Sequence, residues 1–366
     1  MRKEFILREV EVYLMDQIGF GVIGVGTIGV SHLRWLKSIP EVKVVAAADV
    51  SIENLHRAKK LFNIPNTYSD YRDLLKDPKV EAVIVSTPPE FHEQQVIDAA
   101  EAGKHIFCEK PMATNLEECD NMIDSVKSAG VKFQIGFDSR FNIAYMKAKR
   151  MIENGEIGKP VMIRANRRSA TIWWRPPEKM PNFWLWDWEK GGGPIIEQCI
   201  HEIDLSRWFF GSEAVRVYCE LGSLVRKLKC GDNAGILIRY DNGGIAIIDT
   251  SFSLPAGHPF DVRLEILGSE GRIDVDLLIS NLTVKSMISK FKERRPIPML
   301  LGSGGPWLGS WEAECHLNEL RHFVKCIREN KDPRVTGIDG KRALEIALAA
   351  VKSGLLKRPV ELPLKE

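Results

Sequence analysis

Several features are absent or scarce in this sequence, and each absence argues against a class of protein. The seven cysteines are odd in number and include no C-x-x-C pair, which argues against a disulfide framework and a structural zinc site and indicates a reducing, cytoplasmic location. No apolar run reaches the roughly 18 residues that a membrane-spanning helix needs. The 51 Lys and Arg nearly balance the 49 Asp and Glu, and the short basic run 292–295 is interpreted as a solvated loop. Binding to membranes or to nucleic acid is therefore not expected.

A secretory signal is also absent. Residues 1–14, within an N-terminal extension that spans 1–16, alternate charged with apolar residues, whereas a signal needs an uninterrupted apolar core. Two interpretations stay open for this extension. It is either an arm that packs on a neighbouring subunit or an upstream segment with Met15 as the true first residue.

The clearest positive signal is a glycine-rich turn between an apolar run and an amphipathic segment. The turn reads GVGTIG at 24–29 and matches the G-x-G-x-x-G pattern of dinucleotide-binding proteins. The first glycine permits a tight turn, the second lets the backbone approach a pyrophosphate, and the third lets the helix lie close to the strand. The phosphates would sit on free N–H groups at the helix N-terminus. The predicted cofactor contacts in this turn are Gly24, Gly26, Thr27, Ile28 and Gly29.

An acidic residue follows the turn at the expected distance. Asp49 ends the second apolar run, 20 residues beyond Gly29, where a carboxylate can accept hydrogen bonds from the adenosine ribose hydroxyls. The same carboxylate would repel a 2′-phosphate, and Val50 and Ser51 offer no arginine to receive one. The sequence therefore favours NAD over NADP as the cofactor.

The 366 residues are long for one domain, and the pattern of elements predicts two. In the first, residues 17–137, apolar runs alternate with helical patterns, which is typical of parallel βαβ units. The strands are expected at 80–86, 104–108 and 132–137, and the helices at 51–62, 91–102 and 116–129. We therefore predict an α/β dinucleotide-binding domain.

Residues 138–366 follow a different pattern, in which strands succeed one another without helices between them. Strands are expected at 214–221, 234–240, 244–252 and 262–267, and closing helices at 311–328 and 340–353, which could pack back on the first domain. The tripeptide Asp-Asn-Gly at 241–243 predicts a hairpin. This pattern favours an α+β domain with an open, mostly antiparallel sheet that binds substrate and forms oligomers. The apolar residues assigned to its outer face, a candidate subunit interface, are Ile236, Ile238, Ile245 and Ile247.

Two further segments follow predicted parallel strands, at the end of the sheet where ligands gather. In Glu109-Lys110-Pro111, the lysine ammonium could hydrogen-bond a substrate hydroxyl and stabilise developing negative charge on its oxygen, unless the lysine is simply solvated. In STPPEFH, at 86–92, small residues and prolines could line the cofactor site or merely form a capped loop. The predicted cofactor contacts in these two segments are Thr87, Pro88, His92, Glu109 and Lys110.

A candidate acid/base group lies in the stretch 191–204. If a helix begins at Pro194, then Glu197, His201 and Asp204 share one face. A neutral imidazole titrates near the pH that alcohol oxidation needs, and a nearby carboxylate can orient it and stabilise its cation. A purely structural histidine is the alternative. A metal site is not expected, because position 199 would face away from 197 and 201.

Tryptophan is concentrated in one segment. Five of the nine tryptophans fall within 173–188, and aromatic rings of this size suit the faces of sugar rings. A loop that fills the core or an interface is an equal alternative. The residues predicted to contact the substrate are Arg140, Trp173, Trp174 and Asp204.

The motifs GVIGVGTIG, AAAD, STPPEFH, CEKPMA, GFDSRFN and GGGPIIEQCIHEID occur in this order. Together they resemble the glucose-fructose oxidoreductase, inositol dehydrogenase and MocA (Gfo/Idh/MocA) family, over nearly the whole chain from residue 18. The resemblance implies a Rossmann domain, a second domain with an open antiparallel sheet, and a homo-dimer or homo-tetramer. It places the family's lysine at Lys110 and its catalytic histidine at His201. The family often has Asp where this chain has Glu197.

The resemblance implies NAD(P)-dependent oxidation or reduction of a hydroxyl-bearing carbon in a sugar, cyclitol or sugar derivative. In this hypothesis His201 is the acid/base, Lys110 positions the hydroxyl and Glu197 supports one or both. Two alternatives stay open. One is a glycosidase of the same fold that oxidises its substrate transiently, and the other is a regulator that binds the dinucleotide without turnover.

Overall fold

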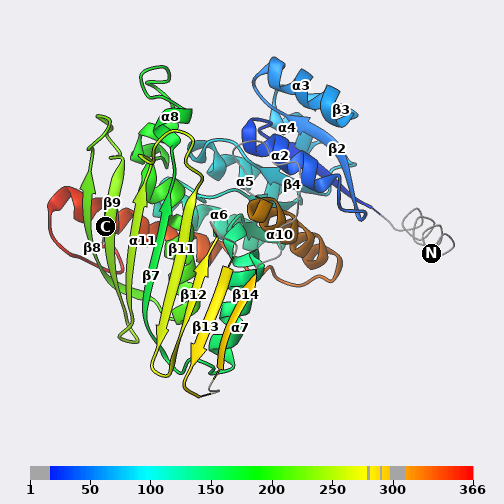
Figure 1. Cartoon of the computed structure of the whole chain (residues 1–366). Coiled ribbons are helices and arrows are strands. Elements are labelled where there is room, and N and C mark those ends of the chain that lie inside the picture. Colours follow the sequence, from blue (N-terminus) through cyan, green and yellow to red (C-terminus); the bar gives the residue numbers. More distant parts are fainter. Residues whose placement is uncertain (1–16, 278–280, 289–290, 297–309, 366) are drawn as a thin grey trace. The chain divides into compact units, whose positions relative to one another are not determined.

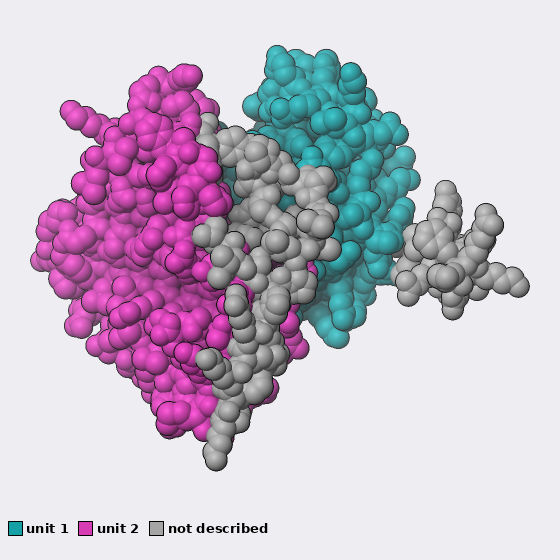
Figure 2. Space-filling model, in the orientation of Figure 1, with its two compact units in different colours: residues 1–113, 117–136, 316–338 teal, residues 114–116, 137–315, 339–366 magenta. Residues whose placement is uncertain are grey.

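The computed structural model in Figure 1 describes residues 17–277, 281–288, 291–296 and 310–365. These residues form two compact units, coloured separately in Figure 2. Unit 1 holds the described residues of 1–113, 117–136 and 316–338, and unit 2 holds those of 114–116, 137–315 and 339–366. The N-terminal extension, for which an arm or an upstream segment was predicted, lies outside the described residues.

Unit 1 is built on a six-stranded parallel sheet with the order β3-β2-β1-β4-β5-β6. The strands are β1 (Ile18–Ile23), β2 (Val42–Ala48), β3 (Asn66–Tyr68), β4 (Ala82–Val85), β5 (His105–Cys108) and β6 (Phe133–Ile135). Every residue of β1 and β4 is buried, as expected for strands covered on both faces. The strand order reverses between β1 and β4, so their carboxyl ends flank the crevice in which such sheets bind ligands.

The helices of unit 1 follow the predicted alternation. They are α2 (Thr27–Leu36), α3 (Ile52–Phe62), α4 (Tyr71–Leu75), α5 (His92–Glu101) and α6 (Leu116–Ala129). The hydroxyl of Ser51 accepts a hydrogen bond from the Asn54 amide and caps α3. Neither β3 nor α4 was predicted, since they have only three and five residues.

A segment far along the chain completes unit 1. Residues 316–338 include most of α10 (Ser310–Arg328), whose Phe323 ring lies 6.3 Å from Phe20 and 6.0 Å from Phe107 between ring centroids. The amide of Gln134, on β6, donates a hydrogen bond to the Glu319 carbonyl on α10. The first closing helix therefore packs mostly within unit 1, whereas nearly all of the second, α11 (Gly337–Leu356), belongs to unit 2.

Unit 2 is built on a nine-stranded sheet with the order β14-β13-β12-β11-β7-β10-β9-β8-β15. Among the strand pairs that the structure describes in this sheet, only β7–β10 is parallel. The strands are β7 (Pro160–Arg168), β8 (Ala214–Gly222), β9 (Asn233–Tyr240), β10 (Ile245–Ser251), β11 (Asp261–Gly268), β12 (Gly271–Asp276), β13 (Asn281–Ser286), β14 (Phe291–Pro296) and β15 (Val360–Glu361). The predicted hairpin joins β9 to β10. The basic run 292–295 lies in β14 and not in the predicted loop.

The helices of unit 2 include α7 (Ile143–Glu153), α8 (Thr171–Trp174) and α9 (Ile200–Phe210). The single helix predicted from Pro194 is instead two elements, because a π-helical turn, η5 (Pro194–Gln198), precedes α9. Its i→i+5 hydrogen bond runs from the Cys199 amide to the Pro194 carbonyl. This bond widens the turn. The predicted placement of Glu197 on one face with His201 stays a prediction.

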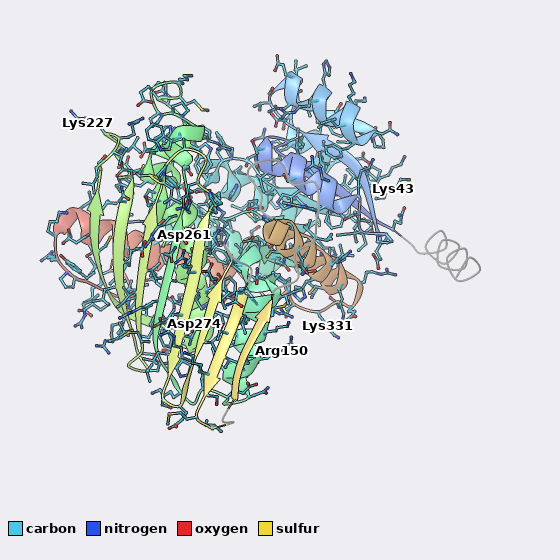
Figure 3. The ribbon with its side chains drawn as sticks, viewed as in Figure 1. Lys43, Arg150, Lys227, Asp261, Asp274 and Lys331 are labelled. Carbon is cyan, nitrogen blue, oxygen red and sulfur yellow. The ribbon has the colours of Figure 1, made fainter. Side chains whose placement is uncertain are left out.

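The residues on the outer face of the nine-stranded sheet are not all those that the sequence predicted. Ile236 and Ile238 are 2% and 0% exposed and pair with Ile248 and Ala246 on the inner face, toward α9. On the outer face Leu237 pairs with Ile247, and these two side chains are 46% and 39% exposed. Two of the four predicted outer-face residues are thus core residues. The outer face also carries charged groups such as Asp274, paired with Arg272 (Figure 3).

Of the helices that the structure describes, none combines the length and the hydropathy needed to cross a bilayer.

Candidate active site

The glycine-rich turn joins β1 to α2 in unit 1. Gly24 has a φ of +85°, which favours glycine, and a Cβ on Gly29 would lie 1.9 Å from the Gly24 carbonyl oxygen. At Gly26, by contrast, a Cβ would meet nothing within 4 Å. No side chain caps the N-terminus of α2, which starts at Thr27. The close packing at two glycines and the open space at the third fit a dinucleotide diphosphate held on the first amides of the helix, which include those of Thr27 and Ile28.

Asp49 is fixed beside this turn. Its Oδ2 accepts a hydrogen bond of 2.8 Å from the Val25 amide, and its Oδ1 accepts one of 2.8 Å from the Ser51 amide. These bonds hold the half-buried carboxylate at the end of β2, next to the glycine turn. An acceptor in this position fits the ribose hydroxyls of NAD.

We expect Asp49→Asn to raise the Kd for NAD about 10- to 100-fold, because hydrogen bonds to a charged acceptor contribute on the order of 1.5–3 kcal/mol. The Kd for NADP should rise less or fall, since the charge that repels a 2′-phosphate is gone. Calorimetric titration with both nucleotides measures these changes. Asp73→Asn, at a 57% exposed side chain on α4, is the control. An unchanged Kd for NAD would refute the role of Asp49.

His92 has a different place from the one predicted. It is fully buried; its Nε2 lies 2.8 Å from the Thr87 carbonyl oxygen and its Nδ1 lies 3.1 Å from the Pro111 carbonyl oxygen. Burial lowers the pKa of this imidazole. His92 therefore ties the loop after β4, which holds Thr87 and Pro88, to the loop after β5. Both ring nitrogens face the backbone, so the predicted cofactor contact is replaced by a supporting role.

Glu109 likewise uses its carboxylate within the protein. Its Oε1 lies 2.6 Å from His32 Nε2, and its Oε2 accepts a hydrogen bond of 3.1 Å from the Lys110 amide. Burial raises the pKa of Glu109, but the hydrogen bond and charge of His32 outweigh it and bring the pKa to about 2. Glu109 thus holds the backbone of Lys110 after β5, in place of the predicted cofactor contact. Lys110 itself is half-buried.

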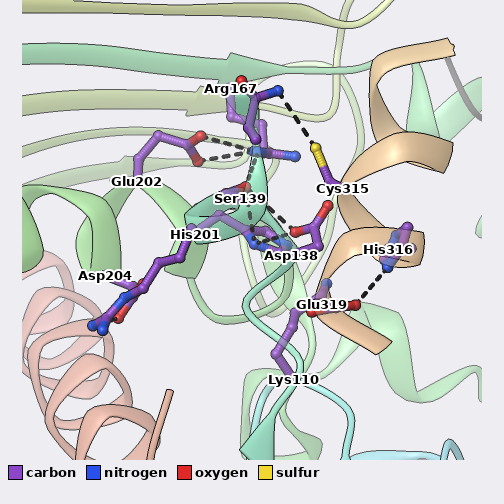
Figure 4. A network of polar contacts seen from close by, with 12 residues as sticks. Lys110, Asp138, Ser139, Arg167, His201, Glu202, Asp204, Cys315, His316 and Glu319 are labelled. Carbon is purple, nitrogen blue, oxygen red and sulfur yellow. Dashed lines mark hydrogen bonds and ion pairs between the residues drawn. The ribbon is translucent and has the colours of Figure 1, made fainter. Parts of the chain in front are cut away.

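His201 lies in the first turn of α9, in unit 2. Its Nδ1 lies 3.1 Å from Asp138 Oδ1 and 3.5 Å from the Ser139 hydroxyl (Figure 4). Asp138 and Ser139 belong to η2 (Asp138–Phe141), which follows β6. His201 and Asp138 are only 6% and 3% exposed. The carboxylate at the imidazole is therefore Asp138, which the sequence argument missed.

A buried ion pair adjoins this histidine. Arg167, on β7, donates from Nε to both oxygens of Glu202 at 3.0 and 2.9 Å, and its Nη2 donates to the Ser139 hydroxyl at 3.2 Å. Burial raises the pKa of Glu202 to about 7, although the guanidinium acts in the opposite direction. Figure 4 shows Glu202, Arg167, Ser139, Asp138 and His201 as one connected network.

Two residues predicted to contact the substrate bind each other instead. Arg140 donates from Nε and Nη2 to the two oxygens of Asp204 at 2.7 and 2.6 Å, and these residues are 3% and 0% exposed. Arg140 also contacts Asp339 at 3.1 Å, which in turn binds Arg207. Arg140 and Asp204 therefore form a structural ion pair, and the prediction that they contact substrate is wrong.

The tryptophan-rich segment divides between core and surface. Trp186 is buried with Ile172, Leu185 and Phe252, whereas Trp173 is 42% exposed with the Arg226 guanidinium 4.5 Å from its ring centroid. The side chain of Trp174 lies outside the described residues. Glu197 lies in η5 and is half-buried. Among the described residues no cluster of three His, Cys, Asp or Glu is arranged to hold a metal ion.

One signal in the sequence could have identified Asp138. It lies shortly after the parallel strand β6, in the motif GFDSRFN, and the carboxyl end of such a strand is where functional residues gather. Nothing local to Arg167 or Glu202 identified their pairing, because they lie 35 residues apart on a strand and a helix.

Comparison with known proteins shows the family to which this chain belongs. Residues 18–137 match the model of an oxidoreductase family with an NAD-binding Rossmann fold, and residues 145–274 match the GFO/IDH/MocA C-terminal domain. Myo-inositol 2-dehydrogenase of Thermotoga maritima is 34% identical over 93% of this chain and 98% of its own. The NAD⁺-dependent scyllo-inositol 2-dehydrogenase of Bacillus subtilis is 32% identical over 95% and 97%. A levoglucosan dehydrogenase structure with NADH and levoglucosan is 27% identical, with a TM-score of 0.83 over 95% of this chain and 100% of its own.

The protein is thus an NAD-binding oxidoreductase with a Rossmann domain and a mostly antiparallel second domain. The chain belongs to the Gfo/Idh/MocA family. These findings confirm the predicted family, fold class, dehydrogenase activity and NAD cofactor.

Proposed function

We propose that this dehydrogenase oxidises a hydroxyl-bearing carbon of a sugar, cyclitol or sugar derivative, with a cyclitol as the first candidate. The relatives named inositol dehydrogenase support the cyclitol, because they reach 32–34% identity over nearly the full chain. The levoglucosan dehydrogenase is more distant at 27% identity. A rigid polyol ring is common to both substrate classes.

Three side chains carry the proposed chemistry. His201 takes the proton from the reacting hydroxyl during oxidation and returns it during reduction. Lys110 donates a hydrogen bond to the same hydroxyl and stabilises its developing negative charge. Glu197 supports one or both of them. Bound NAD supplies the hydride acceptor.

The observation on which the proposal rests is the buried imidazole of His201 with a carboxylate 3.1 Å from its Nδ1. A neutral imidazole in this state can accept a proton near neutral pH, and a positioned group of this kind contributes about 10²–10⁴-fold to the rate. A regulator that binds the dinucleotide without turnover has no need of such a group.

The proposal is tested by steady-state NADH formation from NAD⁺ with a panel of inositol isomers, monosaccharides and levoglucosan. We expect sustained NADH production with at least one polyol, in equal amount to the oxidised product. Cleavage of a glycoside without net NADH would instead identify the transient-oxidation glycosidase. Binding of NAD with no turnover across the panel would identify the regulator.

We also propose that the outer face of the nine-stranded sheet joins subunits into a homo-dimer or homo-tetramer. The exposed apolar side chains there are Leu237, Ile247 and Leu267, and an apolar face of this kind is typical of a subunit contact. We expect Leu237→Asp with Ile247→Arg to reduce the mass measured by light scattering to that of a smaller species. Leu61→Glu, at a 61% exposed residue of α3, should leave the mass unchanged. A monomeric natural protein would refute this interface.

A further inference from the structure

We infer that Asp138 is the residue that positions His201. Its carboxylate accepts a hydrogen bond from the Nδ1–H of the imidazole, so that Nε2 is the atom that exchanges a proton with substrate. The inference rests on the proposed function and adds a residue to its machinery. Asp138 acts through the histidine and is therefore a positioning residue.

The first step of the argument is the contact itself. Asp138 Oδ1 lies 3.1 Å from His201 Nδ1, and both side chains are more than nine-tenths buried. The two residues stand 63 positions apart, one in η2 and the other in α9. An anionic carboxylate can only accept a hydrogen bond. The neutral imidazole therefore carries its proton on Nδ1, and the lone pair lies on Nε2.

The second step concerns Ser139, the other group near Nδ1. Its hydroxyl accepts a hydrogen bond from Arg167 Nη2 at 3.2 Å and donates to Asp138 Oδ1 at 3.3 Å. Its distance to Nδ1, 3.5 Å, is at the limit for a hydrogen bond. Because the serine proton is directed to Asp138, the carboxylate is the stronger partner of the histidine. Arg167 is itself held by two bonds to Glu202, which fixes the whole arrangement.

The third step is the charge around the pair. The ionisable residues on the elements that pack here include Asp138 on η2, Tyr145 on α7, Arg167 on β7, Glu197 on η5, and Cys199 and Glu202 close to His201 in sequence. Burial raises the pKa of the Tyr145 hydroxyl and of the Cys199 thiol, so both are neutral near pH 7. Arg167 disfavours a cationic imidazole, but Glu202 binds that guanidinium. The carboxylate in direct contact with Nδ1 is thus the group that stabilises the imidazolium formed when His201 takes a proton.

This arrangement predicts the effect of Asp138→Asn, which keeps the shape of the side chain and removes its charge. We expect kcat to fall by about 10²–10⁴-fold with KM changed less than about threefold, because substrate contacts are retained. In the oxidation direction the neutral imidazole is the active form, so activity rises as pH passes the pKa of His201. Without the carboxylate that pKa falls, and the acidic limb of the kcat profile should move to lower pH.

Two measurements separate positioning from a structural role. Asp138→Asn should keep NAD affinity and melting temperature near those of the natural protein, and Asp138→Glu should recover part of the lost kcat. Asp332→Asn, at a 91% exposed side chain of unit 1, is the control and should change nothing. A kcat within threefold of the natural enzyme with an unmoved acidic limb would overturn the inference. Lower stability without a change in kcat would overturn it as well.

The inference can also be tested without a substrate. Nitrogen NMR of the full chain labelled at histidine reports which ring nitrogen carries the proton, and His201→Asn assigns the signal. We expect the Nδ1-protonated form in the natural protein and a lower imidazole pKa in Asp138→Asn. The opposite tautomer in the natural protein would reject the positioning role. If the tautomer is as expected but no polyol is oxidised, the proposed function fails while the pairing stands.

Discussion

Replacement of His201 by alanine is expected to lower kcat for polyol oxidation by at least 100-fold, and Lys110→Ala should have an effect of similar size. The first change removes the proton acceptor, whose contribution is about 10²–10⁴-fold. The second removes the ammonium that stabilises developing negative charge on the reacting oxygen, which is commonly worth about 10²–10³-fold in kcat. Steady-state kinetics with the best substrate of the panel measures both, and calorimetry shows whether NAD still binds.

The two variants should differ in their pH dependence. His201→Ala should lose the acidic limb of the kcat profile, because the group that must be neutral for oxidation is gone, whereas Lys110→Ala should retain it. Matched controls are His258→Ala and Lys43→Ala, both at exposed positions and the latter labelled in Figure 3. Full activity in either active-site variant would remove that residue from the proposed mechanism.

The largest loss of stability is expected from Asp204→Ala. This change leaves the Arg140 guanidinium buried after removing the carboxylate that accepts hydrogen bonds at 2.6 and 2.7 Å. Removing one partner of a buried ion pair lowers the free energy of unfolding by about 3–5 kcal/mol. Asp339, the other carboxylate that contacts Arg140, cannot replace Asp204 fully because it also binds Arg207. Urea unfolding followed by the tryptophan fluorescence of unit 2 measures the change in unfolding free energy.

A matched surface pair provides the control for this prediction. Asp70 and Arg72 are 48% and 58% exposed. Asp70→Ala should lower the free energy of unfolding by no more than about 1–2 kcal/mol, which is the sum expected for the loss of an exposed ion pair and of an N-cap. The double change Asp204→Leu with Arg140→Met should recover part of the loss, because it leaves no unpaired charge in the core. A cost below about 1 kcal/mol for Asp204→Ala would contradict the structural assignment of this pair.

The parts of the fold that could be predicted from sequence are those with a strong local pattern. The buried strands of unit 1, the glycine turn and Asp49 all follow from short-range spacing, and so does the hairpin between β9 and β10. The face of β9 could not be predicted, because Ile236, Leu237 and Ile238 are apolar on both sides of the strand. Period-two alternation then carries no information about which side is buried.

The candidate site was predicted less completely for a different reason. The π-helical turn η5 interrupts the single helix assumed from Pro194, and the carboxylate beside His201, Asp138, lies in a different segment of the chain. The partners of the charged residues also lie far apart in the sequence, with 64 positions between Arg140 and Asp204. Spacing within one segment can show that His201, Asp204 and Lys110 carry suitable chemistry, but not which groups neutralise them.

The return of residues 316–338 to unit 1 has a consequence for synthesis of the chain. Phe323 packs beside Phe20 and Phe107, and the Glu319 carbonyl accepts a hydrogen bond from Gln134 Nε2. A nascent chain on the ribosome has all six strands of unit 1 by residue 135 but must wait for nearly two hundred further residues before this aromatic contact can form. The nucleotide-binding half therefore reaches its final packing only after most of the other half has been translated.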